Sequence, residues 1–285
     1  MTGLADQGLL ESGPETLEYR MIGPRPDAAP TLVMLHEGLG CVGMWGDFPD
    51  RLAAATGCGV FVYSRAGYGK SSPVNLPRPL DYMTDEAQVS LPRLLERIGF
   101  QRGILVGHSD GASIAAIYAG SHQDHRVRGL VLMAPHFICE DVTAKSIAEA
   151  RDTYNTGDLR ARLQKWHPNV DNAFCGWADV WLENDFRQWE ISEELAYIRV
   201  PILIVQGEDD QYGTLRQIEI AQEECYCPVD VALLPGVKHN PAREAPEVTL
   251  RTVSDFVTRI LHGHEPGRLG GVSAACGRGA VRSGA

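Results

Sequence analysis

The sequence predicts an α/β fold with a mostly parallel central sheet, helices on both faces, and a helical lid inserted after the sixth strand. Short, wholly apolar runs alternate with longer amphipathic stretches, which is typical of buried parallel strands covered by helices. The alternation stops once, over residues 141–198, where the pattern is helical and no strand-like run occurs. With 285 residues and 44% apolar content, the chain can form one large globular domain.

Outside residues 141–198, the predicted strands and helices alternate along the chain. Strands are expected over 31–37, 59–65, 103–109, 127–135, 200–210 and 229–236. Helices are expected over 44–57, 85–99, 110–120, 214–224 and 246–261. The first two of these helices end at Gly57 and Gly99, and glycine is the residue that most often ends a helix.

Residues 141–198 are predicted to form the lid, and residues 1–140 and 199–262 the core. This segment contains Trp166, Trp177, Trp181 and Trp189, four of the five tryptophans of the chain. A right-handed crossover would carry it over the C-terminal edge of the sheet. Phe174, Trp177 and Trp181 are three and four residues apart, so they share one helix face. We expect this face to bind substrate, the alternative being that it only packs the lid onto the body.

Composition and charge limit the classes of partner. The formal net charge of −11 disfavours nucleic acid and anionic membranes, and no apolar run approaches the length that crosses a bilayer. The N-terminus lacks the pattern of a signal peptide, so the seven cysteines are expected to be reduced thiols of a cytoplasmic protein.

Cys225 and Cys227 form a C-x-C motif with no second cysteine pair nearby, which is a weak indication of metal binding, and no metal site is expected. The glycine-rich segment 263–285 is expected to be disordered. We expect a small-molecule substrate, and the sequence is compatible with a monomer or a homodimer.

The stretch "ILVGHSDGA", residues 104–112, predicts a nucleophile. Its G-x-S-x-G pattern lies between a predicted strand and a predicted helix, so Ser109 would occupy a strained turn above the sheet edge. Gly107 and Gly111 would leave room for that turn. The helix that begins at Asp110 would direct its N–H groups and positive end toward the same point.

A serine hydroxyl becomes nucleophilic when a base takes its proton, and the base needs an acid to orient it. The carboxylates of "GEDD", residues 207–210, follow a late strand. His239 follows the last strand, on a loop at the same edge of the predicted sheet. Each residue alone has an ordinary structural explanation, but in this order after strands they predict a serine–acid–histidine triad.

Such a triad also needs two N–H groups to stabilise the negative oxygen of the intermediate. The N–H of Asp110, directly after the serine, is one candidate. The other is expected from the loop "HEGLG", residues 36–40, where Gly38 is favoured and Glu37 and Leu39 stay open.

These motifs resemble the α/β-hydrolase fold superfamily, in particular its lidded hydrolases of small esters, lactones and ring-cleavage products. The resemblance covers about residues 15–262 and depends on the segments 36–40, 64–72, 107–111, 207–210 and 238–241. It favours Asp210 over Asp209, because the acid in that fold usually stands three residues after the strand-ending glycine. A serine at the nucleophile position disfavours dehalogenase and epoxide hydrolase chemistry. The sequence departs from the pattern at Glu37, where glycine is usual in the oxyanion loop.

The resemblance implies a serine hydrolase that acts on a carboxylic ester, thioester or lactone with an apolar or aromatic part. Ser109, His239 and Asp210 would be its triad, and no cofactor is expected. One alternative is a hydrolase of carbon–carbon bonds in ring-cleavage products, although such enzymes often carry asparagine where this chain has His108. The other alternative is a ligand receptor on the same fold.

Overall fold

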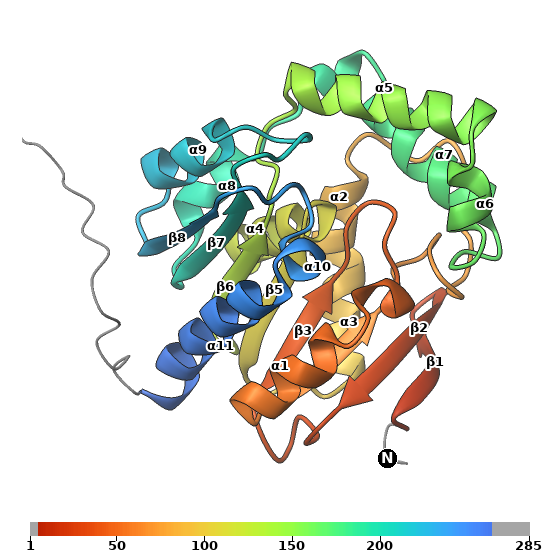
Figure 1. Cartoon of the computed structure of the whole chain (residues 1–285). Coiled ribbons are helices and arrows are strands. Elements are labelled where there is room, and N and C mark those ends of the chain that lie inside the picture. The colour runs from red at the N-terminus through yellow and green to blue at the C-terminus, as the bar shows by residue number, and fades with distance from the viewer. Residues whose placement is uncertain (1–4, 264–285) are drawn as a thin grey trace, which may run out of the picture.

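The computed structural model describes residues 5–263 and contains one eight-stranded sheet (Figure 1). The predicted disordered tail, residues 263–285, lies outside the described residues except for Gly263. The strand order is β1-β2-β4-β3-β5-β6-β7-β8. The strands are β1 (Gln7–Ser12), β2 (Glu15–Ile22), β3 (Thr31–Leu35), β4 (Gly59–Tyr63), β5 (Gly103–His108), β6 (Val127–Met133), β7 (Ile202–Gly207) and β8 (Val229–Leu234). From β4 to β8 every neighbouring pair in the sheet is parallel, as predicted. At the N-terminal end of the sheet, β1 pairs antiparallel with β2, and β2 pairs antiparallel with β4.

The sequence predicts a lid after the sixth strand but locates only four strands before it, so two further strands are implied without assigned residues. They are β1 and β2. The missing assignment follows from their pattern: β2 alternates between buried and half-buried positions, and β1 is mostly exposed. A strand with one face only partly covered has no continuous apolar run, and this holds for β2 between β1 and β4 and for β1 at the sheet edge. The five strands β3 to β7, in contrast, are almost wholly buried and contain the apolar runs from which they were predicted. The other edge strand, β8, was predicted although most of its residues are half-buried or exposed.

The helices are α1 (Phe48–Thr56), α2 (Tyr82–Asp85), α3 (Leu91–Arg97), α4 (Asp110–His122), α5 (Asp141–Thr156), α6 (Leu159–Leu163), α7 (Val170–Trp181), α8 (Ser192–Tyr197), α9 (Arg216–Glu224), α10 (Pro241–Glu244) and α11 (Pro246–His262). The helix expected over 85–99 is observed as α2 and α3 joined by a π-helical turn over Glu86–Ser90. Pro92 lies just after this turn and lacks an N–H to donate.

Two hydrophobic cores lie on the two faces of the sheet. Alternate residues of β3 divide between them, so that Val33 and Leu35 belong to one core and Leu32 and Met34 to the other. Helices α1 and α11 pack against each other in the second core, and α3, α4, α8 and α9 contribute to the first. The sheet is therefore held rigidly between two layers, and its C-terminal edge is a firm support for a site.

The insertion, residues 141–198, forms α5, α6, α7 and α8 between β6 and β7. Figure 1 shows α5, α6 and α7 beyond the C-terminal ends of the parallel strands. Helix α8 returns to the body and packs on α4, where Gly120 leaves space: a side chain there would come within 2.3 Å of the Glu194 carbonyl oxygen. Within residues 5–263, no helix has the length and apolar character to cross a membrane.

Candidate active site

Ser109 lies in the tight turn between β5 and α4. Its backbone has φ 53° and ψ −120°, a conformation that residues other than glycine seldom adopt. The flanking glycines are required by space. A Cβ on Gly107 would lie 2.3 Å from the Gly111 carbonyl oxygen, and a Cβ on Gly111 would lie 2.2 Å from that of Leu35. Ser109 therefore has a strained backbone conformation, in a turn that has no space for side chains at positions 107 and 111.

The structure brings together the three residues predicted as a triad. His239 lies on the loop between β8 and α10, and its Nε2 is 2.9 Å from Ser109 Oγ. Its Nδ1 is 2.8 Å from both carboxylate oxygens of Asp210, which follows β7. Because the carboxylate can only accept, Nδ1 carries the proton, and Nε2 is free to accept the proton of Ser109.

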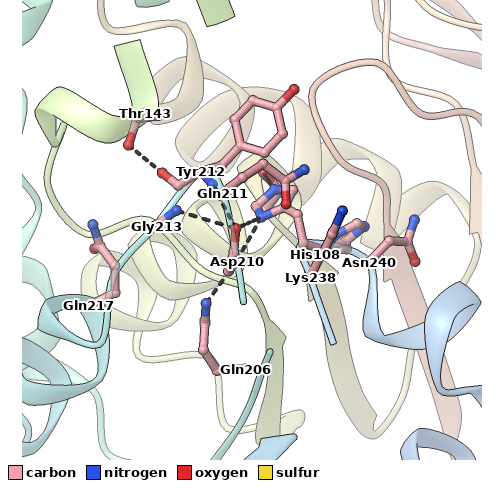
Figure 2. A network of polar contacts seen from close by, with 12 residues as sticks. His108, Thr143, Gln206, Asp210, Gln211, Tyr212, Gly213, Gln217, Lys238 and Asn240 are labelled. Atoms are coloured by element: carbon pink, nitrogen blue, oxygen red, sulfur yellow. Dashed lines mark hydrogen bonds and ion pairs between the residues drawn. The ribbon is translucent and has the colours of Figure 1, made fainter. Parts of the chain in front are cut away.

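Asp210 is held by more than its histidine. Gln206 Nε2 donates to Oδ2 at 2.7 Å, and the N–H groups of Tyr212 and Gly213 donate to Oδ1 at 2.8 and 3.3 Å; Figure 2 shows these groups around the carboxylate. Burial alone would raise the pKa of Asp210, but the hydrogen bond and charge of His239 and the Tyr212 amide outweigh burial and lower it. The neighbouring Asp209 is exposed, and its side chain has no hydrogen bond or ion pair among the described residues.

Gly38 and Asp110, the candidate oxyanion donors, line one cavity with Ser109. Neither backbone N–H is bonded to a protein acceptor within residues 5–263. Asp110 begins α4, so its N–H also lies at the positive end of a helix. The Asp110 side chain points to the interior, where it accepts a hydrogen bond from the Tyr82 hydroxyl.

Glu37 and His108 form an ion pair beside the serine. His108 Nδ1 lies 3.3 Å from Glu37 Oε2, and its Nε2 lies 2.7 Å from the carbonyl oxygen of His239. Both partners only accept, so both ring nitrogens of His108 donate and the imidazole is cationic. Burial favours the neutral imidazole, yet the bond and charge of Glu37 raise the pKa of His108. Burial likewise opposes ionisation of Glu37, but His108 lowers its pKa to about 2.

The cavity above Ser109 has a volume of about 230 Å³. Its walls come from the oxyanion loop, from the insertion and from the loops that follow β6, β7 and β8. The lining includes Glu37, Gly38, Leu39, Met44, His108, Ser109, Asp110, His136, Thr143, Ile147, Trp177, Trp181, Gln211, Tyr212, His239, Asn240, Arg243 and Glu244. This volume is below the roughly 300–1,000 Å³ of typical ligand sites, so it limits the part of a ligand that the cavity encloses to a small organic group.

Two of the three aromatic residues predicted for substrate lie in this cavity. Trp177 packs directly on the oxyanion loop, since a Cβ on Gly38 would lie 2.2 Å from its Nε1. Trp181 also lines the cavity, and its Nε1 donates to the Tyr82 hydroxyl at 3.1 Å. Phe174 does not line it: its ring stacks on Tyr154 of α5 at a centroid distance of 3.7 Å. The shared helix face is wide enough to contact both α5 and the cavity.

His167, which the sequence did not single out, connects the insertion to the oxyanion loop. Its Nδ1 accepts from the Gly69 N–H at 2.9 Å, so its Nε2 carries the proton and donates to the Leu39 carbonyl oxygen at 2.9 Å. Burial lowers the pKa of His167, which favours this neutral form. A lone histidine between two helices carries no motif, so spacing could not reveal this contact.

Within the described residues, no group of three or more histidine, cysteine or acidic side chains is arranged to hold a metal ion. Six cysteines lie in this range, all unpaired; Cys41 and Cys58 are buried and the other four are half-buried.

Known proteins resemble the chain in sequence and in structure. A model of the α/β-hydrolase fold family matches residues 30–187, more than half of the chain. A proline iminopeptidase of Lactobacillus crispatus (strain ST1) is 26% identical over 230 residues, which cover 67% of this chain and 78% of that protein.

Two solved structures illustrate the likeness in fold. The enol-lactonase from Burkholderia xenovorans LB400 aligns with a TM-score of 0.69 and 20% identity, over 88% of this chain and 100% of the lactonase. A malate-bound esterase from Thermogutta terrifontis aligns with a TM-score of 0.69 and 17% identity, over 90% of this chain and 100% of the esterase. At these identities, the two structures establish the common architecture.

Proposed function

Because the chain belongs to the α/β-hydrolase fold family and is a hydrolase, we propose that it is a serine hydrolase of a carboxylic ester, thioester or lactone with an apolar or aromatic part. The observation that carries this proposal is the continuous line of hydrogen bonds from Ser109 through His239 to Asp210, which begins at the cavity. Ser109 is the nucleophile, His239 the general base and Asp210 the residue that orients the base.

The proposed reaction has two halves. Ser109 Oγ attacks the substrate carbonyl while His239 Nε2 takes its proton, and the N–H groups of Gly38 and Asp110 stabilise the oxyanion. His239 then gives the proton to the leaving oxygen or sulfur, and the acyl group stays on Ser109. A water molecule, deprotonated by His239, attacks the acyl carbonyl and restores the serine.

The charged groups of the cavity favour an ester over a peptide with a free amino end. A peptidase that recognises a cationic amino terminus needs an available carboxylate. Glu37 is paired with cationic His108, and the two oxygens of Glu244 accept from the backbone N–H groups of Lys238 and Asn240 at 2.8 and 3.1 Å. The third carboxylate, Asp110, is buried against Tyr82. The proline iminopeptidase relatives nevertheless make an amide substrate the specific alternative that the experiment must include.

The insertion is proposed to act as the lid of this site. Thr143 and Ile147 of α5 and Trp177 and Trp181 of α7 line the cavity above the serine, so these side chains would contact the part of the substrate beyond the scissile bond. Their mostly apolar character matches an apolar or aromatic substituent.

The test is a substrate panel run with the wild type and the Ser109→Ala variant. It contains aryl esters, lactones, acyl thioesters, a vinylogous diketone and a proline anilide. We expect multiple turnover of one oxygen or sulfur ester class and at least a 10³-fold loss in the variant. Preferential cleavage of the anilide or of the diketone would overturn the ester assignment. A single turnover without product release would instead favour the receptor alternative.

A further inference from the structure

His136 is a buried histidine in the cavity that the proposed mechanism does not use. It follows β6 by three residues and is 2% exposed. Its ring centroid lies 5.5 Å from that of His239 and 5.2 Å from that of Trp181, in an edge-to-face arrangement with the latter. It therefore lies beside the general base, at the foot of the insertion.

The backbone around His136 is fixed from two sides. Ser113 Oγ of α4 donates to the His136 carbonyl oxygen at 2.6 Å, and the Phe137 N–H donates to Gln217 Oε1 of α9 at 2.7 Å. Two residues earlier, Ala134 has φ 45°, which is strained for a residue with a side chain. Strain of this kind persists where the surrounding structure holds a functional group in place.

The polar atoms of the His136 ring have no partner in the protein. Nδ1 is fully buried without a hydrogen bond within residues 5–263, and a Cβ on Gly213 would lie 3.6 Å from it. Nε2 makes no hydrogen bond to the described residues either, and the residue lines the cavity. A buried polar group that lacks a partner needs an explanation, because leaving it unbonded costs free energy.

The protonation of this ring follows from its surroundings. Burial, and then the charge of the nearby His239, lower the pKa of His136 to about 3, so the ring is neutral. A neutral imidazole has one N–H and one lone pair. An enclosed N–H without a partner is rarer than an enclosed acceptor, which favours the lone pair on Nδ1 and the proton on Nε2.

We propose that His136 Nε2–H faces the cavity and donates a hydrogen bond to an oxygen atom of the substrate beside the scissile carbonyl. This inference rests on the proposed hydrolase function and narrows it. The substrate class becomes esters, thioesters or lactones that carry a second oxygen, as an ether, hydroxyl, carbonyl or carboxylate group near the reacting bond. His136 is thus a specificity residue, distinct from the triad.

The test uses two pairs of esters in which one oxygen replaces one methylene. On the acyl side, these are 4-nitrophenyl methoxyacetate and 4-nitrophenyl butanoate; on the alcohol side, 2-methoxyethyl acetate and butyl acetate. For each pair, the ratio of kcat/KM, oxygen ester over carbon ester, is measured in the wild type and in His136→Phe. Comparing the ratio between enzymes cancels the intrinsic reactivity of the esters. His125→Phe, at an exposed histidine on the loop between α4 and β6, is the matched control.

We expect the ratio to fall about tenfold in His136→Phe for at least one pair, to stay constant in His125→Phe, and to recover in part in His136→Gln. The Gln amide can reach the position of Nε2, whereas that of Asn cannot. If His136→Phe does not fold, the same comparison is made between His136→Gln and His136→Asn. Equal ratios in wild type and variants for both pairs would overturn the inference while the proposed function stands. Failure of the wild type to cleave any ester, thioester or lactone would overturn both.

Discussion

Replacing Asp210 by asparagine is expected to disable His239 as the general base, because the proton of its ring would move from Nδ1 to Nε2. Oδ1 of Asp210 accepts from the N–H groups of Tyr212 and Gly213, so the single amide oxygen of an asparagine is held at that position. The amide NH₂ then occupies the position of Oδ2, against His239 Nδ1. Nδ1 lies equally close to the amide oxygen, but that oxygen already accepts from two N–H groups, so the NH₂ donor favours the tautomer in which Nδ1 accepts and Nε2 carries the proton. The histidine would then point an N–H at Ser109 and could not take its proton.

The magnitude follows from this change of role. A serine hydrolase whose histidine is held in the wrong tautomer loses about 10⁴-fold in kcat, which corresponds to about 5.5 kcal/mol of transition-state stabilisation. The loss should be confined to chemistry. The Asp→Asn change keeps size and shape, so KM is expected to change less than about threefold.

The assay compares Asp210→Asn with Asp209→Asn on the best ester of the panel. Asp209 is exposed and its side chain has no partner among the described residues, so its variant should keep kcat within about twofold. Both variants carry the same change of charge, which makes Asp209→Asn a matched control. Comparable kcat values for the two variants, or the larger loss at Asp209, would refute the assignment of the acid.

Three further outcomes are expected. Trp177→Ala should lower kcat/KM about tenfold for a bulky aryl ester and less for an acetate ester, which loses only the contact of Trp177 with the Gly38 loop. Phe174→Ala should lower the free energy of unfolding by about 3 kcal/mol and affect both esters alike. Equal losses on the two esters in Trp177→Ala would contradict a lid-built pocket. Gly38→Ala would place a Cβ 2.2 Å from the indole nitrogen, so kcat for the acetate ester should fall at least tenfold, and an unchanged kcat would count against the role of this loop. Glu37→Gln should reduce stability by about 3 kcal/mol, measured by urea unfolding across pH. Ionised Glu37, whose pKa is lowered in the fold, contributes stability above its ordinary pKa of 4.5, and this contribution is lost as pH falls through about 2. Protonated His108, whose pKa is raised in the fold, contributes stability below its ordinary pKa of 6.5, and this contribution is lost as pH rises through the raised value. The difference from wild type should therefore be largest between about pH 4.5 and 6.5, and a difference that does not vary with pH would disprove the ion pair.

The parallel sheet and the juxtaposition of Ser109 with His239 could be predicted because both depend on local pattern and chain order. Apolar runs mark buried strands, and residues that follow parallel strands meet at one edge. The glycines around Ser109 could be interpreted in the same way, since the turn leaves no space for side chains at 107 and 111. In β2, buried and half-buried positions alternate, so this signal is missing.

Other features depend on distances that spacing does not encode. Phe174, Trp177 and Trp181 share a helix face, but the rotation of α7 and the position of α5 decide which ring meets the cavity. His136 and His167 belong to no motif, and their roles appear only when segments far apart in the chain are placed together. Sequence patterns thus identify groups that act through chain order and miss those that act through packing.

The contacts of the insertion suggest why its helices and the oxyanion loop should be considered one unit. The indole of Trp177 covers Gly38, and His167 holds the Leu39 carbonyl oxygen on the same loop. Trp181 is linked through the Tyr82 hydroxyl to the side chain of Asp110, the residue proposed as the second oxyanion donor. Both proposed donors are therefore fixed from the insertion as well as from the sheet. Because an oxyanion site depends on donors held in place before the reaction, the insertion contributes to the geometry of the chemistry itself in addition to the shape of the cavity.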